Sequence, residues 1–366
     1  MTLDLYIARR FLMVFLRIFG IFLGVLTLID LIEQIRRFGD VGIGVSQALI
    51  LALLNIPETL YRILPLLMVL SAITLFLGLA KSSELVVVRA AGRAGLRFLL
   101  APVAAALAIG LLAVAVLNPL VAATAKEYER RSAVLAGGAA GSVLSVSAEG
   151  LWLRQGDSNG QTVIHAAQIA PDGTQLSDVT LHLFSLGGAL SGRIEAARAQ
   201  LQPGEWVLEE AKVWHFDTPN PEAAARLAEG PMALPTDLTP AQLIEGLGAT
   251  GSVAFWDLSA QAAAMERAGF SARGLYLSLQ MELALPLLLA AMVLVGAGFT
   301  MRHARFGKTG QMVLYALMAG FFIFFLRNFA QVLGENGQIP IVIAAWTPPV
   351  AACLLSLSLL LHLEDG

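Results

Sequence analysis

Long apolar runs occupy both ends of the chain, and a more polar stretch separates them. A run of 18 or more mostly apolar residues is typical of a membrane-spanning helix, because about 20 residues cross the hydrocarbon layer. Three such runs precede the polar stretch and three follow it. The pattern therefore predicts an integral membrane α-helical protein with six transmembrane helices: Phe11–Ile32, Leu49–Leu79, Phe98–Leu117, Leu275–Phe299, Val313–Leu333 and Ile341–Leu361.

Within the polar stretch, apolar and polar residues alternate over four short segments: 150–154, 162–166, 179–184 and 206–216. Alternation with a period of two is typical of half-buried strands, and turn formers such as Gly156–Gly160 lie between the segments. The sequence therefore predicts an antiparallel, jelly-roll-like β domain between helices 3 and 4. Helices are expected on both sides of it, at Ala122–Leu135 and Asp257–Ala268. The expected domains are residues 1–117, 118–271 and 272–366.

Composition agrees with a membrane protein. Apolar residues make up 57% of the chain and charged residues 14%, whereas charged residues are about a quarter of an ordinary soluble protein. The net charge of −3 gives no reason to expect nucleic acid or another polyanion as a partner. Cys353 is the single cysteine, so no disulfide can form within the chain. It lies in an apolar run.

The distribution of Lys and Arg near the span ends predicts the orientation in the membrane, because these residues collect on the cytoplasmic side. The two short loops on one side hold only Arg36 and Arg37. The other side is much more basic, so we expect both termini to be cytoplasmic and the β domain to lie outside. No cleavage pattern follows the first run, which we interpret as a retained span. The cations of the cytoplasmic side are Arg9, Arg10, Lys81, Arg89, Arg93, Arg97, Arg302, Arg305 and Lys308.

The cytoplasmic stretch Lys81–Arg93 is longer than a turn between two spans requires. Ser82 or Ser83 is suited to cap a short helix, with Glu84 in its first turn and Gly92 at its end. We therefore expect a short amphipathic helix at residues 82–93. Its apolar run favours two interpretations about equally: a helix that rests on the bilayer, or one that docks into a groove of a soluble partner.

Catalytic and metal-binding patterns are weak in this sequence. Gly307-Lys308-Thr309 resembles part of a phosphate-binding loop, but Arg302 stands where that loop requires its first glycine. The five histidines are scattered, and neither a nucleophile motif nor a paired-carboxylate arrangement is present. We therefore expect no catalytic residues, no metal site and no cofactor in this chain, which predicts a protein that is not an enzyme.

Cations near the predicted outer ends of the spans suggest a second kind of site. Arginine offers two parallel hydrogen bonds to a phosphate, so a ring of such cations suits an anionic head group. Each of them alone is about as well explained as an anchor that reaches to the interface, and acids such as Asp30 and Glu33 dilute the charge. Glu58 and Arg62, one helical turn apart, are expected to pair. The candidate head-group residues are Arg36, Arg37, Lys126, Arg130, Arg131 and Arg327.

Several motifs resemble a known family, the lipopolysaccharide-export permeases LptF/LptG. The resemblance covers essentially the whole chain and includes the arrangement of three plus three spans around a β domain. In Ser83–Gly92, the Ser-Glu-Leu-Val-Val sequence is more similar to the LptG branch than to its paralogue LptF. The segments that carry the resemblance are Leu5–Phe11, Pro57 with Pro65, Ser83–Gly92, Gly150–Trp152, Pro340 and Trp346–Pro348.

The resemblance implies a permease subunit of an ABC transporter in the bacterial inner membrane, which moves lipopolysaccharide toward a periplasmic bridge. It implies a paralogous permease LptF, a cytoplasmic LptB ATPase dimer that uses ATP and Mg²⁺, and the single-span protein LptC as partners. Arg36 and Arg37 would meet lipid A phosphates, although Asp30 stands where relatives commonly have a lysine. The coupling helix would enter a groove of the ATPase through Ser83, Glu84, Leu85, Val86, Val87, Arg89 and Gly92.

Three alternatives remain from the sequence. The chain would be the LptF paralogue of the same complex if the branch assignment failed. A mechanotransmitting or lipoprotein-releasing permease would typically have four spans. An intramembrane enzyme acting on lipids would need a reactive cluster, and the sequence shows none.

Overall fold

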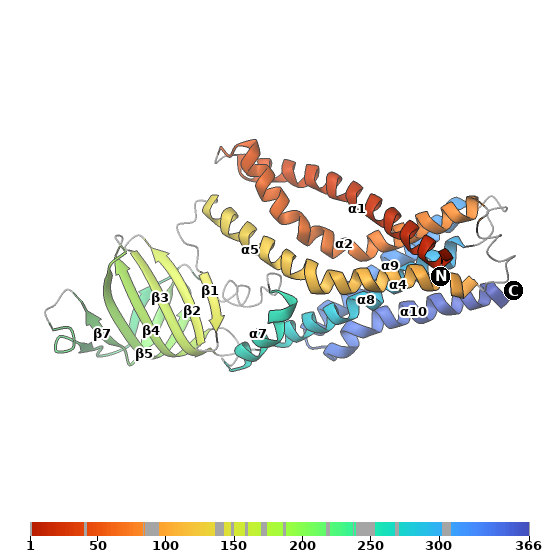
Figure 1. Cartoon of the computed structure of the whole chain (residues 1–366). Coiled ribbons are helices and arrows are strands. Elements are labelled where there is room, and N and C mark those ends of the chain that lie inside the picture. The colour runs from red at the N-terminus through yellow and green to blue at the C-terminus, as the bar shows by residue number, and fades with distance from the viewer. Residues whose placement is uncertain are drawn as a thin grey trace. The chain divides into compact units, whose positions relative to one another are not determined.

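Six helical segments are long and apolar enough to cross a membrane (Figure 1). The structure is a computed structural model, and the prediction of six spans with an antiparallel sheet between the third and the fourth is confirmed. The residues that the structure describes are 2–39, 42–82, 84, 95–135, 143–147, 150–157, 160–169, 174–185, 188–216, 220–236, 238, 253–267, 271–301 and 309–365.

The spans before the sheet are α1 (Thr2–Arg37), α2 (Val45–Lys81) and α4 (Gly95–Leu112). The third span does not end near Leu117 as expected. It continues through the π-helical turn η2 (Ala113–Leu117) into α5 (Asn118–Leu135), so the helix expected from Ala122 is part of the same long element. Pro119 follows this turn and has no amide hydrogen, and a wide π turn is a common way to accommodate such a local irregularity.

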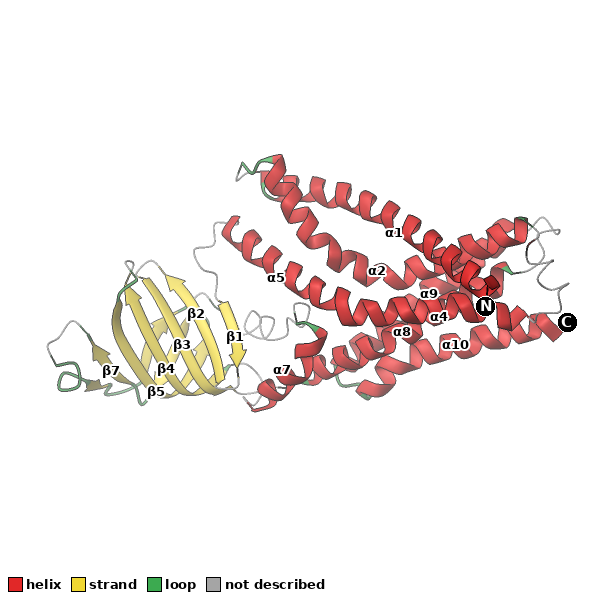
Figure 2. Cartoon of the chain, in the orientation of Figure 1, coloured by secondary structure: helices red, strands yellow, loops and turns green. Residues whose placement is uncertain are grey.

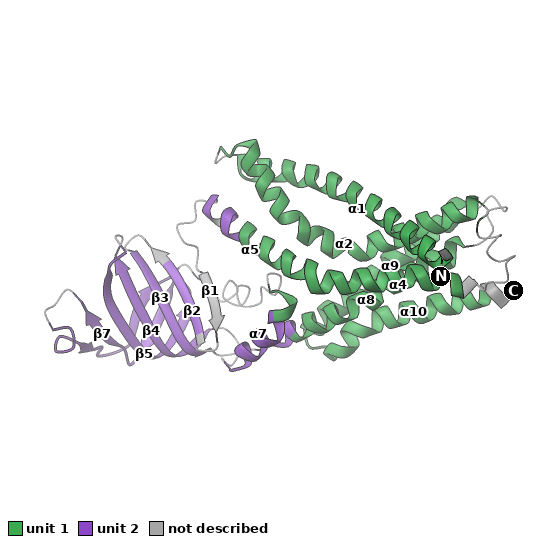
Figure 3. Cartoon of the chain, viewed as in Figure 1, with its two compact units in different colours: residues 1–128, 252–256, 276–366 green, residues 129–251, 257–275 purple. Residues whose placement is uncertain are grey.

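The spans after the sheet are α8 (Arg273–Thr300), α9 (Thr309–Glu335) and α10 (Ile341–Asp365), and the shorter α7 (Phe255–Arg267) precedes them. The chain divides into two compact units (Figure 3). The first unit, called here the membrane unit, comprises residues 1–128, 252–256 and 276–366, and the second comprises residues 129–251 and 257–275.

Helices α2 and α8 form the centre of the membrane unit, and both bury many apolar side chains. Small residues allow the close approach that drives helix association inside a membrane. A Cβ added to Gly296 of α8 would lie 2.6 Å from the Cβ of Ala72 on α2. One added to Gly110 of α4 would lie 2.5 Å from the Cα of Pro286 on α8. These two glycines therefore set how closely the three helices pack.

The second unit contains an antiparallel sheet in the order β1-β2-β3-β4-β5-β6-β9, in which β7 also pairs with β5 and β8. Strands β1 to β5 lie side by side in Figure 2. Most strands pair with their neighbours in sequence. The strands are β1 (Val143–Ser147), β2 (Gly150–Asp157), β3 (Gly160–Ile169), β4 (Gln175–Ser185), β5 (Leu190–Gln202), β6 (Glu205–Glu209), β7 (Lys212–His215), β8 (Arg226–Leu227) and β9 (Met232–Pro235).

Side chains from one face of this sheet form its own core around the fully buried Trp206. Strand β5 pairs with β7 along its first half and with β6 along its second half. Its buried positions shift by one residue between Ala196 and Ala199 at this change of partner. The segment 206–216, expected as one strand, is divided into β6 and β7 at Glu210, which has a φ of 54°.

Candidate functional site: an apolar hollow with a polar rim

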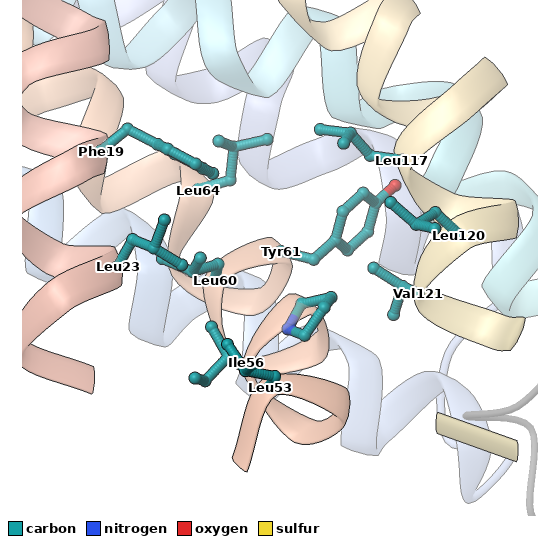
Figure 4. A pocket seen from close by; sticks show the side chains of 11 residues that line it. Phe19, Leu23, Leu53, Ile56, Leu60, Tyr61, Leu64, Leu117, Leu120 and Val121 are labelled. Atoms are coloured by element: carbon teal, nitrogen blue, oxygen red, sulfur yellow. The ribbon is translucent and has the colours of Figure 1, made fainter. Parts of the chain in front are cut away.

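An apolar hollow of about 190 Å³ lies in the membrane unit between α1, α2 and the helix that runs from η2 into α5 (Figure 4). An apolar lining of this kind favours contact with hydrocarbon over contact with water. The walls are almost entirely aliphatic or aromatic carbon, and the Tyr61 hydroxyl is the polar group among the labelled side chains. The lining residues are Phe19, Leu23, Leu53, Ile56, Pro57, Leu60, Tyr61, Leu64, Leu117, Leu120 and Val121.

Helical periodicity explains why these residues share one space. Leu53, Ile56, Leu60 and Leu64 of α2 are three or four positions apart, so they lie on one face of the helix. Phe19 and Leu23 of α1 have the same spacing. The hollow is therefore the meeting place of three helical faces that are apolar throughout.

Polar side chains of the same three helices meet next to the hollow. On α1 and α5 this polar layer begins at Asp30 and Tyr128, each seven residues, about 10 Å, beyond the last lining residue of its helix. The Asn55 amide donates to the Asp30 carboxylate at 2.9 Å, and the Gln34 amide donates to the Tyr128 hydroxyl at 3.1 Å. Arg37 donates to the same hydroxyl at 3.4 Å. We call these five residues the polar rim. Hydrocarbon space beside a polar layer fits an amphipathic molecule.

The predicted head-group cations differ in their surroundings. Arg36 pairs with Glu33 at 2.8 Å but is still 75% exposed. Arg37 lies over the Phe38 ring, 5.4 Å from its centre, and belongs to the polar rim. Lys126 is exposed on α5, two residues before Tyr128. Arg130 and Arg131 are exposed near the end of α5 and belong to the second unit.

Arg327 has a different environment from the other cations. It lies on α9, partly buried, and interacts electrostatically with Glu282 of α8 and Tyr61 of α2. The Tyr61 hydroxyl donates to the Glu282 carboxylate. The structure thus gives Arg327 an acidic partner within the spans. Glu282 was not among the predicted site residues, although a single acid inside an apolar run is a usable sequence signal.

Comparison with known proteins identifies the family. The family model described as "Lipopolysaccharide export system permease LptF/LptG" matches residues 5–362. The chain belongs to the LptF/LptG family. It is 24% identical to the lipopolysaccharide export system permease protein LptG of Escherichia coli strain K12, over 99% of this chain and 98% of that protein. The LptG protein of an E. coli O6:H1 strain gives the same values. Within the LptF/LptG family the chain is most like LptG, and it is a multi-pass inner-membrane protein.

Of the predicted coupling residues of this LptF/LptG permease, Glu84 is described, and Ser83, Leu85, Val86, Val87, Arg89 and Gly92 lie outside the described residues. The Arg10 guanidinium on α1 donates to both Glu84 carboxylate oxygens, at 2.7 and 2.8 Å. The Ser82 hydroxyl donates at 2.8 Å and the Tyr6 hydroxyl at 3.4 Å. The hydrogen bond from Arg10, followed by that from Ser82, holds the pKa of Glu84 below its usual value. The start of α1 is therefore bonded to the predicted coupling segment.

Proposed function

We propose that this chain is the LptG-type half of a permease pair that extracts lipopolysaccharide from the outer leaflet of the inner membrane. The observation that carries the proposal is the apolar hollow beside the polar rim, in a chain of the LptF/LptG family. In the proposed orientation both termini are cytoplasmic, and the rim and the β domain lie on the periplasmic side. The basic cytoplasmic loops support this orientation.

In this proposal the hollow receives acyl chains and the cations beside the rim meet the head-group phosphates. Arg36, Arg37 and Lys126 lie on α1 and α5 at the level of the rim, and Arg130 and Arg131 follow on α5. The volume of about 190 Å³ is smaller than the roughly 300–1,000 Å³ of pockets for drug-sized ligands. A lipid with several acyl chains therefore needs further walls, which the paired permease would supply.

The faces of α1 and α9 support such a pairing. Both helices bury few residues of their apolar windows, whereas α8 buries most of its own. On α9 the large exposed side chains include Phe321, Phe322, Phe325 and Phe329. Outward faces of this kind suit either lipid or a second membrane protein, and the family match favours the paralogous permease LptF as the occupant.

The energy must come from another protein in this proposal. Each buried CH₂ group retains the lipid in the bilayer by about 0.8 kcal/mol, so extraction of several chains is strongly uphill. A cytoplasmic LptB dimer that hydrolyses ATP would drive it through the segment around Glu84, and LptC and a periplasmic bridge would receive the product. The contact between Arg10 and Glu84 supports a direct mechanical path from that segment to α1.

The experiment that tests this function is reconstitution. The chain is co-expressed with a six-span paralogue and the ATPase, purified as a complex, and placed in proteoliposomes that contain lipopolysaccharide. We expect ATP-dependent release of lipopolysaccharide to a soluble periplasmic acceptor, and no release with a hydrolysis-deficient ATPase. Release that is independent of ATP, or a complex that forms without the paralogue, would contradict the proposal.

The alternative of a mechanotransmitting or lipoprotein-releasing permease is not favoured. Such permeases typically have four spans, whereas this chain has six candidate spans and matches the lipopolysaccharide export family along nearly its whole length. The similarity to LptG likewise favours this branch over the LptF paralogue.

A further inference from the structure

A second cavity of the membrane unit lies near the start of α1, far along the helix from the polar rim. It is an open cleft of about 400 Å³ between α1 and α2. Arg9, Arg10 and Arg17 of α1 line it, together with Thr74 and Gly78 of α2. We call it the arginine cleft. It is separate from the apolar hollow and from the polar rim.

The charge of the arginine cleft is only partly neutralised. Glu84 forms an ion pair with Arg10. Arg9 and Arg17 form no ion pair with any acidic side chain in the part of the chain that the structure describes. In the sequence, neither 85–97 nor 301–309 contains an acid that would neutralise them. Among the described residues, the cleft therefore has two arginines that pair with no acid, together with several N–H donors, the combination that binds phosphate.

Arg17 lies at a depth in the membrane where charged side chains are usually functional. The 20 positions from Arg10 to Asp30 extend about 30 Å along α1, which is the thickness of the hydrocarbon layer. Arg17 is seven positions inside that interval, about 10 Å from Arg10. An arginine at such a depth is costly and usually functional. Helical side chains lean toward the N-terminus, so Arg17 leans back toward Arg10 and the cleft.

The shape of the cleft leaves room for a ligand beside the arginines. A Cβ added to Gly78 would have no atom within 4 Å, so α2 presents open space at this position. The Thr74 side chain is exposed on the same helix, one turn away. Met13 is 44% exposed and also lines the cleft, which adds an apolar surface next to the charges.

We propose that the arginine cleft binds the phosphate of an anionic phospholipid from the cytoplasmic leaflet, with Arg9 and Arg17 as the main contacts. Basic pockets between membrane helices on this side are suited to such head groups. A lipid fits better than a soluble anion because Arg17 lies at hydrocarbon depth and Met13 offers apolar contact. The proposal rests on the orientation given under the proposed function, and it concerns a lipid that is retained rather than exported.

The test uses the purified complex of this chain with its ATPase and paralogue, with a photoactivatable amino acid at Met13. The complex is placed in nanodiscs that contain either phosphatidylcholine alone or phosphatidylcholine with phosphatidylglycerol. We expect phosphatidylglycerol adducts at Met13. They should fall by about tenfold in Arg9→Gln/Arg17→Gln, because loss of one charge-assisted hydrogen bond is enough for a tenfold change.

Two further variants serve as tests. One fills the space of the cleft without changing its charge, and the other removes an arginine that lies outside the cleft. Gly78→Leu fills the cleft without changing charge and should also suppress the adduct. Arg62→Gln removes an exposed arginine that pairs with Glu58 on another part of α2 and should leave the adduct unchanged. Equal capture of both lipids, or no change in the double arginine variant, would overturn the proposal.

Two other outcomes would replace the lipid with another ligand. Protection of Met13 by inorganic phosphate in nanodiscs of phosphatidylcholine alone would point to a soluble anion. An adduct between Met13 and a partner protein would show that the cleft is a protein contact. Either result overturns the proposal. ATP-dependent lipopolysaccharide release, measured on the same complex, reports separately on the proposed function, so the two ideas can fail independently.

Discussion

The two ends of α1 carry comparable numbers of charged residues but arrange them differently. At the end of the helix, Asp30 accepts from Asn55 and Gln34, and Glu33 pairs with Arg36, so cations and acids largely balance within the rim region. At the start of the helix, Arg9 and Arg17 form no ion pair with an acid in the part of the chain that the structure describes. A balanced hydrogen-bonded layer holds helices in register, whereas an unbalanced cleft attracts an anion.

This difference changes the interpretation of the predicted head-group site. Arg36 and Arg37 already have partners within the chain, so a phosphate must compete with Glu33 for one and with Tyr128 for the other. Binding at the rim would then be reversible exchange, which suits a lipid that is to be passed on. Retention is expected instead where cations have no acidic competitor. Variants at the two ends of α1 and within the spans can test this difference between paired and unpaired cations.

We expect the largest effect at Arg327, because it has an acidic neighbour inside the spans. Arg327→Met removes the cation that interacts electrostatically with Glu282, and should destabilise the protein by about 2–3 kcal/mol because it leaves a buried acid less well compensated. Arg327→Met/Glu282→Leu should recover much of that loss. Thermal unfolding of the purified chain in detergent measures both. A single variant as stable as the wild type would instead return Arg327 to the group of free head-group cations.

Filling the hollow should slow transport strongly and leave lipid binding in the arginine cleft unchanged. Leu23 lines the hollow and is 39% exposed, so Leu23→Trp narrows the space without forcing a core to expand. We expect lipopolysaccharide release to fall by about tenfold, equivalent to roughly 1.4 kcal/mol. The matched control is Leu28→Trp on the same helix, at a 63% exposed position outside the hollow. Equal losses in both variants would mean that the hollow has no special role.

Charge reversal at the rim should have a smaller effect. Arg36→Glu/Arg37→Glu places two acids beside Glu33 and Asp30, which repel a phosphate. Because both arginines already share their charge with partners, we expect a loss of lipopolysaccharide crosslinking of about fivefold, near 1 kcal/mol. Phosphatidylglycerol capture at Met13 should not change. A loss at Met13 as large as that at the rim would remove the contrast between the two ends.

The contact between Arg10 and Glu84 should give the smallest effect, since exposed ion pairs contribute about 0.2–1 kcal/mol. Arg10 lowers the pKa of Glu84, so their attraction is present at neutral pH and is lost as the pH falls through that lowered value. Arg10→Gln returns the pKa toward its usual value but leaves Glu84 charged at pH 7. ATPase association should therefore weaken only slightly in Arg10→Gln and more in Glu84→Gln. Equal association in all three proteins would exclude a coupling role for Glu84.

The spans were predictable from the sequence because membrane helices need only a continuous apolar run of sufficient length. Strand β5 was not. Its Gly192–Gln200 segment contains three Ala, one Gly and one Glu, which are uncommon in strands. Pairing with β4 on one side and with β6 and β7 on the other overrides that preference. The division at Glu210 was equally hidden, because a positive φ outside glycine leaves no clear sequence signal.

The candidate site was predictable only in part for a related reason. Arg36 and Arg37 stood out because they end an apolar run. Tyr128 and the Tyr61–Glu282 pair did not, since their partners lie 91 to 221 positions away in the sequence and only the packing of α1, α2, α5 and α8 brings them together. Counting charges along the sequence therefore located the cations but could not identify the hydrogen-bond partner of each one.

We propose above that lipopolysaccharide enters the hollow between α1, α2 and α5. Site-specific photocrosslinking is the most direct test of this binding. Leu53 and Leu120 line the hollow and are 51% exposed, so both accept a photoactivatable residue, and Leu111 is an exposed control on α4 outside it. We expect lipopolysaccharide adducts at Leu53 and Leu120 that decrease when ATP is added to the reconstituted complex, with little adduct at Leu111. Adducts of equal strength at all three positions, unaffected by ATP, would contradict it.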